Sequence, residues 1–414
     1  MRILLWHGYL LAGTGSNIYT RALAREWSND GHDVVVVCQE RAPEHYDIGA
    51  ARIVNVDLPG GLLPVFVMDR YAGLTPKLLQ DFTDIEKRAY VDANAAALRE
   101  LLPADVVFAN HVLMGGPVGA ASGAPFRVKA HGSELEYSMR GRPELEQWGA
   151  EALADADATY VGSAHIREVL HDVVGHVDRV HEVPPGVDVE EFRLRPRDEA
   201  FAALVEEARH DPPNPGNGSE RLPDDGNADR LASFLAGDEP TVAYFGKLIE
   251  QKGVQVLLEA MRGIDARLVV VGFGPYRAAL EATAPRRTLF TGPFEHRHLA
   301  QLLPLADVTV VPSIFPEAFG MVAAEAAAAG SPPLVARHSG LAEVAAGLED
   351  EYPAHLRHLA AFESGNAEDL RAKLTELLGL PREDRELLRR AARRAVVERW
   401  SWAGVARRLL EPGG

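Results

Sequence analysis

Short apolar runs alternate with amphipathic helical stretches along most of the chain. Two helices are predicted in the first half, over Ser16–Asp30 and, rich in alanine, over Asp84–Leu102. The runs around them indicate buried strands at Ile3–Trp6, Val34–Cys38, Val106–Ala109, Arg127–Ala130, Ala158–Gly162 and His181–Val183. Strands that alternate with helices are typical of βαβ units, so this half predicts a parallel sheet.

The same alternation starts again after Pro184-Pro185-Gly186-Val187-Asp188, a stretch typical of a hinge between domains. The strands predicted there are Thr241–Phe245, Arg267–Val271, Thr288–Phe290 and Val308–Val311, and the helices that follow them are Val254–Met261, Tyr276–Thr283, His296–Leu303 and Phe319–Ala329. A chain of 414 residues is also too long for one ordinary core. The pattern therefore predicts an α/β protein of two doubly wound domains, residues 1–187 and 188–395.

Two segments depart from this alternation. Asp211–Asp229 is rich in Pro, Gly, Asn and Asp and nearly free of apolar residues, so we expect a mobile surface insertion between two short helices. Pro381–Pro412 is arginine-rich and predicts one long helix. A basic amphipathic helix can meet a membrane, but we favour packing of its apolar stripe on the protein body, with about residues 396–414 returning to the first domain.

Composition removes several functional classes. Sixty acidic against 43 basic residues leave a formal charge of −17, which argues against a nucleic-acid binder. Cys38 is the single cysteine, so disulfides and cysteine-based zinc sites are excluded and a reducing compartment is favoured. No apolar stretch approaches the roughly 18 residues of a membrane span, and the opening MRILLWHGYLL predicts a buried strand rather than a signal peptide. We expect a cytoplasmic protein.

Glycine-rich turns follow strands in both halves. Gly13-Thr14-Gly15-Ser16-Asn17 comes directly after the first strand, where backbone N–H groups can approach an anion. It resembles half of a dinucleotide-binding fingerprint, but Ile18 stands where the third glycine belongs. Glu40, at the end of the second strand, could take the place of the acidic residue that binds ribose in such sites. A tight turn between strand and helix explains the motif equally well. Gly272 and Gly274 follow a strand of the second half. They either leave room for a ligand or only allow the turn between strand and helix.

The most specific pattern is a pair of carboxylates eight residues apart, Glu317 and Glu325, at the start of a predicted helix. At about 1.5 Å per residue they are at most about 12 Å apart, which suits opposite ends of an elongated ligand. Free N–H groups at the helix start suit a phosphate between them. Lys247 and Lys252 follow the first strand of the same half, where two cations can neutralise a diphosphate.

Taken in order, these motifs resemble the retaining GT-B glycosyltransferases of family 4, which use nucleotide sugars. The resemblance spans nearly the whole chain: the Gly15 loop, His131-Gly132-Ser133-Glu134, Pro185-Gly186-Val187-Asp188, GKLIEQKG, VVVGFGP, the Glu317 to Glu325 stretch, Ser339-Gly340-Leu341-Ala342-Glu343 and Trp400-Ser401-Trp402. It implies two Rossmann-like domains facing a cleft, with the donor mostly on the second. Family members usually have arginine where Lys247 stands, and lysine keeps the charge without the bidentate fork.

The resemblance also implies roles for individual residues. The diphosphate would be held by Lys247, Lys252 and the helix start at Phe319, Gly320 and Met321; Glu325 would bind ribose, and Glu317 and His131 the transferred sugar. Gly272, Gly274 and Phe294 would lie beside the nucleotide, Gly15 would close over the phosphates, and Asn17, Tyr19 and His111 would meet a hydroxyl acceptor. No metal or cofactor is implied. No carboxylate is placed as a covalent nucleophile, so a front-face mechanism is expected, in which the leaving diphosphate takes the acceptor proton.

Other interpretations remain open. His7, His111 and His131 each follow a strand of the first sheet, and three histidines can bind a metal, although no carboxylate pattern accompanies them. A GT-B sugar-nucleotide epimerase and a non-catalytic sugar-nucleotide sensor would keep the same binding residues. A phosphorylase lacks a pyridoxal-type lysine context here, and an NAD-dependent oxidoreductase lacks the third glycine.

Overall fold

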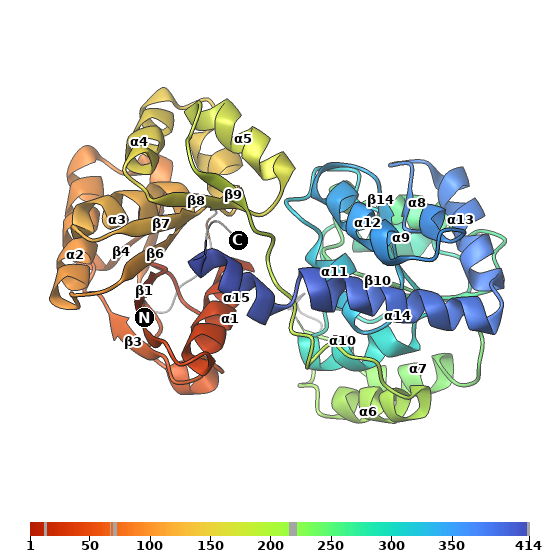
Figure 1. Ribbon diagram of the computed structural model, residues 1–414. Coiled ribbons are helices and arrows are strands. Elements are labelled where there is room, and N and C mark those ends of the chain that lie inside the picture. The colour runs from red at the N-terminus through yellow and green to blue at the C-terminus, as the bar shows by residue number, and fades with distance from the viewer. Residues whose placement is uncertain (12–14, 67, 69–72, 215–221, 412–414) are drawn as a thin grey trace. The chain divides into compact units, whose positions relative to one another are not determined.

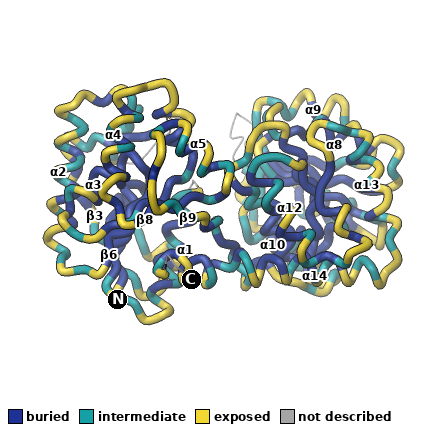
Figure 2. The backbone as a smooth tube through the Cα atoms, turned by 45° about the horizontal axis from the view of Figure 1, so that its top comes forward, coloured by how far each residue is buried: buried dark blue, intermediate teal, exposed yellow. Residues whose placement is uncertain are grey.

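A computed structural model describes residues 1–11, 15–66, 68, 73–214 and 222–411 (Figure 1). The chain divides into two compact units, one of Met1–Gly186 with Trp402–Gly414 and one of Val187–Ser401. Each unit contains a parallel sheet covered by helices, and in both the strands are the most deeply buried parts (Figure 2). The predicted α/β class, with two parallel sheets, is confirmed.

The sheet of the first unit has seven parallel strands in the order β3-β2-β1-β6-β7-β8-β9. Their bounds are β1 Arg2–Trp6, β2 Asp33–Cys38, β3 Arg52–Asn55, β6 Val106–Asn110, β7 Phe126–Lys129, β8 Ala158–Val161 and β9 Val180–Glu182. A separate parallel pair is formed by β4 (Leu62–Val65) and β5 (Thr75–Leu78). The sequence did not predict β3, β4 or β5, which are only four residues long and not fully buried.

Side chains of β1 alternate between two apolar layers, as the two-residue period of a strand requires. Ile3 and Leu5 pack with α1 (Gly15–Asn29) and α15 (Trp402–Leu410). Leu4 and Trp6 pack on the other face, which is covered by α2 (Asp84–Glu100), α3 (Gly116–Ser122), α4 (Pro143–Ala154) and α5 (Ala164–Val174). Because both faces are covered, strands of this sheet are apolar throughout rather than alternating.

The second unit has a six-stranded parallel sheet in the order β12-β11-β10-β13-β14-β15. Its strands are β10 Thr241–Phe245, β11 Arg267–Val271, β12 Thr288–Phe290, β13 Val308–Val311, β14 Pro333–Ala336 and β15 Ala361–Phe362. The helices are α6 Arg197–Arg209, α7 Asn227–Phe234, α8 Val254–Ala260, α9 Arg277–Thr283, α10 His296–Leu302, α11 Met321–Ala328, α12 Ser339–Glu351, α13 Ala367–Gly379 and α14 Arg382–Arg399. The four strands that the sequence predicted here are present with the predicted bounds.

The C-terminal stretch is not one helix. α14 ends at Arg399, Trp400 leaves the helical conformation, and α15 begins at Trp402. The carbonyl of Trp400 accepts a hydrogen bond from Val187 N–H at 2.7 Å, and Val187 pairs with Ser401 as an isolated bridge. Through these contacts Trp400 and Ser401 belong to the second unit with Val187. The chain therefore returns to the first unit at Trp402 rather than near residue 396.

α15 belongs to the first unit through hydrogen bonds to its backbone carbonyls. Trp27 Nε1 donates to Ala406 at 2.9 Å, while Tyr160 Oη and Arg127 Nη1 both donate to Leu409, at 2.8 and 2.6 Å. These donors satisfy carbonyls of the last turn, which have no partner inside the helix. The apolar stripe of α15 thus packs on the protein body, as the sequence predicted.

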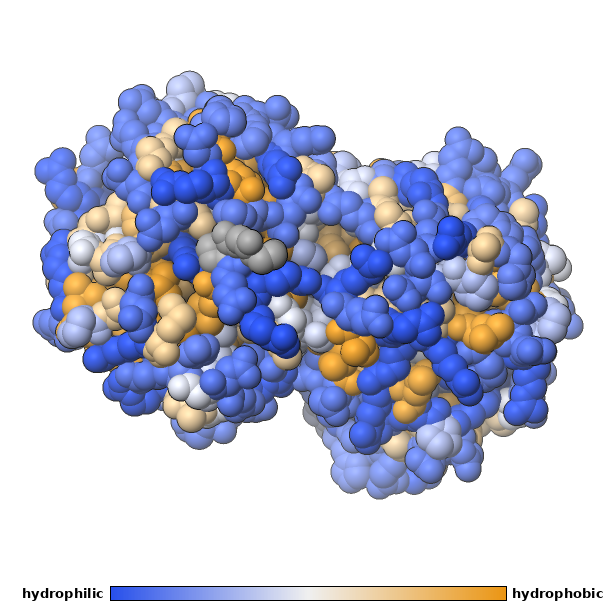
Figure 3. Space-filling view, in the orientation of Figure 1, coloured by the Kyte–Doolittle hydropathy of each residue, from blue (hydrophilic) through white to orange (hydrophobic). Residues whose placement is uncertain are grey.

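Within the described ranges no helix is long and apolar enough to span a bilayer, and the face of the molecule shown in Figure 3 is largely hydrophilic.

Strand order fixes where a ligand site can form. In each sheet the chain leaves the central strand in one direction and later returns to its other side, so the order reverses between β1 and β6 and between β10 and β13. Ligands of doubly wound sheets bind beyond the carboxyl ends of the strands at such points. His7 and His111 directly follow β1 and β6, and the segments after β10 and β13 carry Lys252 and Glu317.

Candidate functional site

In the second unit, two glycines let the segments after β10 and β11 cross in close contact. Gly272 and Gly274 have φ values of 148° and 151°. A Cβ atom at Gly272 would lie 1.8 Å from the carbonyl oxygen of Gly246, and one at Gly274 would lie 2.3 Å from that of Leu248. Both positions therefore exclude side chains because of backbone packing inside the unit. Close approach of a nucleotide is not needed to explain them.

Lys252 and Glu317 meet directly. The Lys252 ammonium forms an ion pair with Glu317 Oε1, and both side chains are partly buried. The backbone around Glu317 is fixed by α12, because Glu317 N–H donates to Ser339 Oγ at 2.8 Å and Gly340 N–H donates to the Glu317 carbonyl at 3.0 Å. Lys247, in contrast, is exposed. The structure thus pairs a residue predicted to bind the phosphates, Lys252, with one predicted to bind the sugar, Glu317. The sequence did not indicate this pairing.

The start of α11 lies between the two glutamates in the chain. Gly320 precedes the helix with φ 125°, and no side chain caps it, so N–H groups of the first turn stay available for an anion. Met321 is half-buried at the first helical position. Phe319 differs from the prediction: its side chain is 4% exposed and packs edge-on against Trp400, with ring centroids 5.5 Å apart. It anchors the helix start in the core, so only its backbone is placed for ligand contact.

Glu325 lies in the second turn of α11 and is buried. Burial raises the pKa of its carboxyl to about 7, with the neighbouring Glu191 adding to the increase and His296 opposing it. His296 lies between the two carboxylates, with Nε2 3.7 Å from Glu325 Oε1 and Nδ1 3.8 Å from Glu191 Oε2. Neither His296 nor Glu191 was singled out from the sequence, because the contact joins three segments far apart in the chain.

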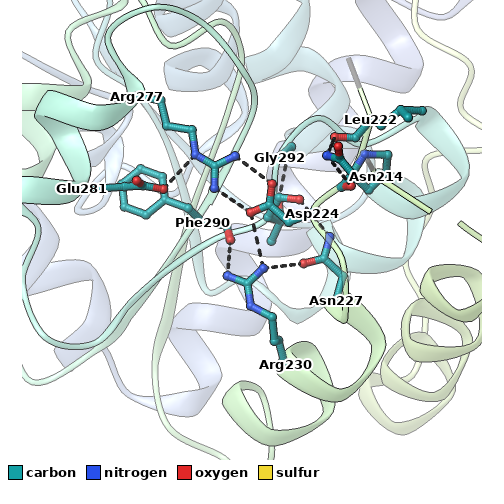
Figure 4. Close-up of polar contacts among 11 residues, drawn as sticks. Asn214, Leu222, Asp224, Asn227, Arg230, Arg277, Glu281, Phe290 and Gly292 are labelled. Atoms are coloured by element: carbon teal, nitrogen blue, oxygen red, sulfur yellow. Dashed lines mark hydrogen bonds and ion pairs between the residues drawn. The ribbon is translucent and has the colours of Figure 1, made fainter. Parts of the chain in front are cut away.

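The inserted segment is anchored beside the loop that follows β12 (Figure 4). Asp224 accepts two hydrogen bonds from Arg277, at 2.8 and 2.6 Å, and one from Arg230 at 3.4 Å. Asp224 N–H and Asn227 Nδ2 both donate to the Thr291 carbonyl, at 2.9 and 2.8 Å. The flanks of the insertion are therefore fixed to the sheet. Residues 215–221 of the predicted mobile loop lie outside the described residues.

Phe294, predicted to lie beside the nucleotide, stacks on His298 with ring centroids 4.7 Å apart. His298 is buried, and its Nε2 lies 2.9 Å from Asp211 Oδ1 at the beginning of the insertion. Burial lowers the pKa of His298, while Asp211 opposes the decrease. The half-buried ring of Phe294 thus packs on His298, which is in turn paired with Asp211, a contact that could not be predicted from the sequence.

In the first unit, three histidine rings gather beyond β1, β6 and β7. The ring of His111 lies 4.8 Å from that of His131 and 6.2 Å from that of His7, between centroids. Each ring has a polar partner: His7 Nε2 contacts Asn17 Oδ1 at 2.8 Å, His131 Nε2 contacts Asn110 Oδ1 at 2.7 Å, and His111 Nδ1 contacts Glu134. Within the described ranges, no three His, Cys, Asp or Glu side chains are grouped so that they could hold a metal ion.

Burial separates the predicted contact residues of this unit. Asn17, Tyr19 and His111 are 1%, 2% and 3% exposed, whereas His131 is partly exposed. Tyr19 packs edge-on against His131, with centroids 5.1 Å apart. The three predicted acceptor residues are therefore buried, whereas the ring of His131 belongs to a partly exposed residue.

The structure describes only part of the glycine loop and shows what Glu40 contacts. Gly15 is the exposed first residue of α1, while Gly13 and Thr14 lie outside the described residues. The carboxylate of Glu40 accepts hydrogen bonds from its own and a neighbouring loop, from Leu11, Arg41 and Ala42 N–H at 3.3, 3.1 and 3.0 Å. It closes these turns, which is a structural role and removes the main support for a dinucleotide ribose acid.

Comparison with known proteins places two segments of the chain in glycosyltransferase families. The family model described as Glycosyltransferase Family 4 matches residues 13–191, and that of Glycosyl transferases group 1 matches residues 227–395. D-inositol 3-phosphate glycosyltransferase of Xylanimonas cellulosilytica is 34% identical over 217 residues, 49% of this chain and 46% of the relative. The protein of that name from Mycobacterium tuberculosis strain F11 is 32% identical over 281 residues, 65% and 51% of the two chains. The chain thus spans about half the length of these curated relatives.

Solved structures show the same fold over nearly the whole chain. Sucrose-phosphate synthase from Thermosynechococcus elongatus has a TM-score of 0.69 at 21% identity, covering 99% of this chain and 97% of that one. Anabaena HepE in complex with UDP has a TM-score of 0.68 at 16% identity, covering 99% of both chains. A family 4 match over residues 13–191 is followed by a group 1 match over residues 227–395, and with this fold the chain belongs to the GT-B glycosyltransferases.

Proposed function

We propose that the protein is a retaining, metal-independent glycosyltransferase that moves a sugar from a nucleoside-diphosphate sugar to a hydroxyl acceptor. The observation that carries the proposal is the arrangement beyond β10 and β13. Lys252 contacts Glu317, and the uncapped start of α11 leads within five residues to buried Glu325. A cation, free N–H groups and two carboxylates suit the diphosphate and the two sugar rings of such a donor. The solved HepE complexes, which contain UDP or UDP-glucose, are consistent with this ligand class.

Each group then has a chemical task. Lys252 and the N–H groups at Gly320 and Met321 would stabilise the negative charge that develops on the leaving diphosphate. Glu325 would accept hydrogen bonds from ribose hydroxyls, and Glu317 from hydroxyls of the transferred sugar. When the donor binds, Lys252 exchanges part of its contact with Glu317 for phosphate, which frees Glu317 for the sugar.

His131 is set up as a hydrogen-bond acceptor. Asn110 Nδ2 donates to the Trp6 carbonyl at 3.2 Å and to Thr20 Oγ1 at 3.3 Å, so Asn110 Oδ1 must accept the proton of His131 Nε2. Nδ1 of His131 then carries a lone pair and can accept a hydrogen bond from a substrate hydroxyl. Burial, with smaller electrostatic contributions from His111 and Lys129, holds the pKa of His131 well below its usual value and keeps the ring neutral.

Retention would follow from a front-face reaction. The bond from the sugar to the diphosphate oxygen breaks, the acceptor oxygen bonds to the same carbon from the same face, and its proton passes to the departing phosphate. The protein supplies position and charge stabilisation in this step rather than a base.

A transfer assay tests the proposal. Purified protein is incubated with a panel of nucleoside-diphosphate sugars and polyol or sugar acceptors, with and without a chelator, and the anomeric configuration of the product is read by NMR. Retained configuration and unchanged rates with the chelator are expected. Inverted configuration or a chelator-sensitive rate would contradict the mechanism, and tight donor binding without any turnover would favour a sensor.

A further inference from the structure

Behind His131 lies a buried pair that the proposed reaction does not use directly. His111 Nδ1 contacts one carboxylate oxygen of Glu134, and the other accepts a hydrogen bond from Val112 N–H at 3.0 Å. The side chains of His111 and Glu134 are 3% and 0% exposed. A fully buried carboxylate is costly unless donors meet it, and removal of one partner leaves that cost uncompensated. Both oxygens of Glu134 are therefore committed to the His111 segment.

The backbone is irregular at His111 and in the residues directly after Glu134. His111 has φ 72°, a left-handed conformation that is uncommon for residues other than glycine, and it opens a π-helix, His111–Gly115. Glu134 is followed directly by a second π-helix, Leu135–Met139. π-Helical turns are rare and occur frequently at functional sites, where strained backbone persists because the surroundings hold it. Two such turns bring this imidazole and this carboxylate together.

The contact also fixes the proton on His111. An ionised carboxylate only accepts hydrogen bonds, so Nδ1 of His111 is the donor. Among the described residues, its Nε2 is buried without a hydrogen-bond partner. The imidazole lies between the rings of His131, His7 and Phe66, the last with its centroid 4.9 Å away. His111 is thus held by one polar contact and by ring packing, with its face turned to its neighbours.

We propose that His111 and Glu134 are positioning residues for His131: the pair orients the His131 ring so that its Nδ1 accepts a hydrogen bond from a substrate hydroxyl. This role rests on the glycosyl transfer proposed above. Glu134 holds the proton on His111 Nδ1, and His111 in turn presents a fixed ring to His131. The two residues do not touch substrate.

Burial shifts the pKa values of the other titratable groups around the rings. His7, on the segment after β1, is buried, and burial, with a smaller electrostatic contribution from His111, lowers its pKa to about 3. Lys129 at the end of β7 is buried, which lowers its pKa to about 7, and its side-chain nitrogen donates to the Val183 carbonyl at 2.8 Å. Burial raises the pKa of Tyr19 on α1, so this phenol stays neutral. Glu134 contacts this group of rings through His111.

The decisive variant is Glu134→Gln. Its amide oxygen can still accept Val112 N–H, but its NH₂ group then faces His111 Nδ1, so the proton of His111 should move to Nε2. Nitrogen NMR of ¹⁵N-histidine-labelled free protein distinguishes protonated from unprotonated ring nitrogens, with signals assigned by single His→Gln variants. Glu136→Gln is the matched control, because Glu136 is an exposed carboxylate in the adjacent π-helix, paired with Arg140. Glu134→Asp keeps the charge and should restore part of the parent behaviour.

Three results are expected. In the parent, His111 carries its proton on Nδ1 and His131 on Nε2, without any substrate present. In Glu134→Gln, the proton of His111 moves to Nε2. In the same variant kcat falls about tenfold while the donor KM changes less than about twofold.

The parent spectrum alone can overturn the proposal. A lone pair on His111 Nδ1, or a proton on His131 Nδ1, contradicts it even if Glu134→Gln does not fold. A proton that stays on His111 Nδ1, or an unchanged kcat, in folded Glu134→Gln contradicts it as well. If the predicted spectra are found but the parent transfers no sugar, the proposed function fails and the positioning of His131 stands.

Discussion

Glu325 provides a test of the second unit that needs no substrate. Its pKa in the folded protein is raised from the usual 4.5 to about 7 by burial. Between these two values the folded chain holds a proton that the unfolded chain has released, so this residue makes stability fall as pH rises from about 4.5 to about 7. At about 1.4 kcal/mol per pH unit, the full difference corresponds to about 3 kcal/mol.

Glu325→Gln removes this dependence, because glutamine has nearly the same shape and no charge. Relative to the parent, the variant should gain about 2–3 kcal/mol in unfolding free energy between pH 5 and pH 8. His296 and Glu191 are present in both proteins, so their own contributions to stability largely cancel in the comparison. The gain should be confined to the second unit, since Glu325 has no part in the core of the first.

Urea unfolding at pH 5, 6, 7 and 8, followed by far-UV circular dichroism, measures the effect. Trp400 is the single tryptophan of the second unit, so fluorescence of a chain whose other tryptophans are replaced by phenylalanine isolates that transition. Glu398→Gln, which changes an exposed carboxylate on α14, is the control and should show no trend with pH. A constant difference between parent and Glu325→Gln, or a variant that loses ground as pH rises, would refute the reasoning, because the carboxylate would then not be penalised by burial.

Donor binding should show the opposite dependence. If Glu325 accepts ribose hydroxyls, the ionised form binds best, so affinity for a nucleoside-diphosphate sugar should increase from pH 6 to pH 8. A diphosphate esterified at both ends has no group of its own that ionises in this range. Calorimetry at the two pH values should show this trend in the parent and not in Glu325→Gln; equal trends in both would remove Glu325 from the ribose site.

Three further changes test other parts of the site. Lys252→Ala should lower kcat about 10²–10³-fold through loss of charge stabilisation at the leaving group, with more activity kept in Lys252→Arg; unchanged turnover would exclude the role. Glu317→Ala releases Lys252 from its ion pair, so affinity for free nucleoside diphosphate in calorimetry should be kept or increase while transfer falls; a loss of that affinity would reverse the proposed donor orientation. Gly272→Ala should destabilise the second unit by about 3 kcal/mol in urea unfolding, because its positive φ is strained for alanine and the new Cβ would collide with the Gly246 carbonyl. Gly379→Ala is the control, since no atom lies near its Cβ, and it should not destabilise the unit. Equal stability of the two variants would contradict the packing argument.

Local pattern was enough to predict most strands of both sheets. β10 to β13 are continuous apolar runs bounded by polar or glycine-rich turns, and burial on both faces produces such runs whatever the rest of the chain does. Three strands of these sheets were not predicted: β3 is partly exposed and polar at both ends, β14 begins with a proline, and β15 has two residues. The spacing of Glu317 and Glu325 was readable for the same local reason: it spans one loop and one helix start.

Contacts between distant segments could not be predicted. The sequence offered Phe319 as a ligand residue, but Trp400, 81 positions later, draws its ring into the core. The long C-terminal helix was interrupted by the hydrogen bond from Val187 to Trp400, which no local propensity encodes. Glu134 belongs to the His131–Glu134 motif, but the sequence assigned it no role, because its partner His111 lies 23 residues earlier. The positive φ of His111 could not be read from the sequence either.

What the sequence by itself determined is the set of elements and the chemistry at strand ends, since both depend on short-range periodicity and residue type. Tertiary structure decided which of those groups act together. It paired Lys252 with Glu317, buried Asn17 and Tyr19 behind His131, and gave Glu325 its high pKa. Ion pairing and desolvation depend on distances through space, and only the folded chain sets those distances.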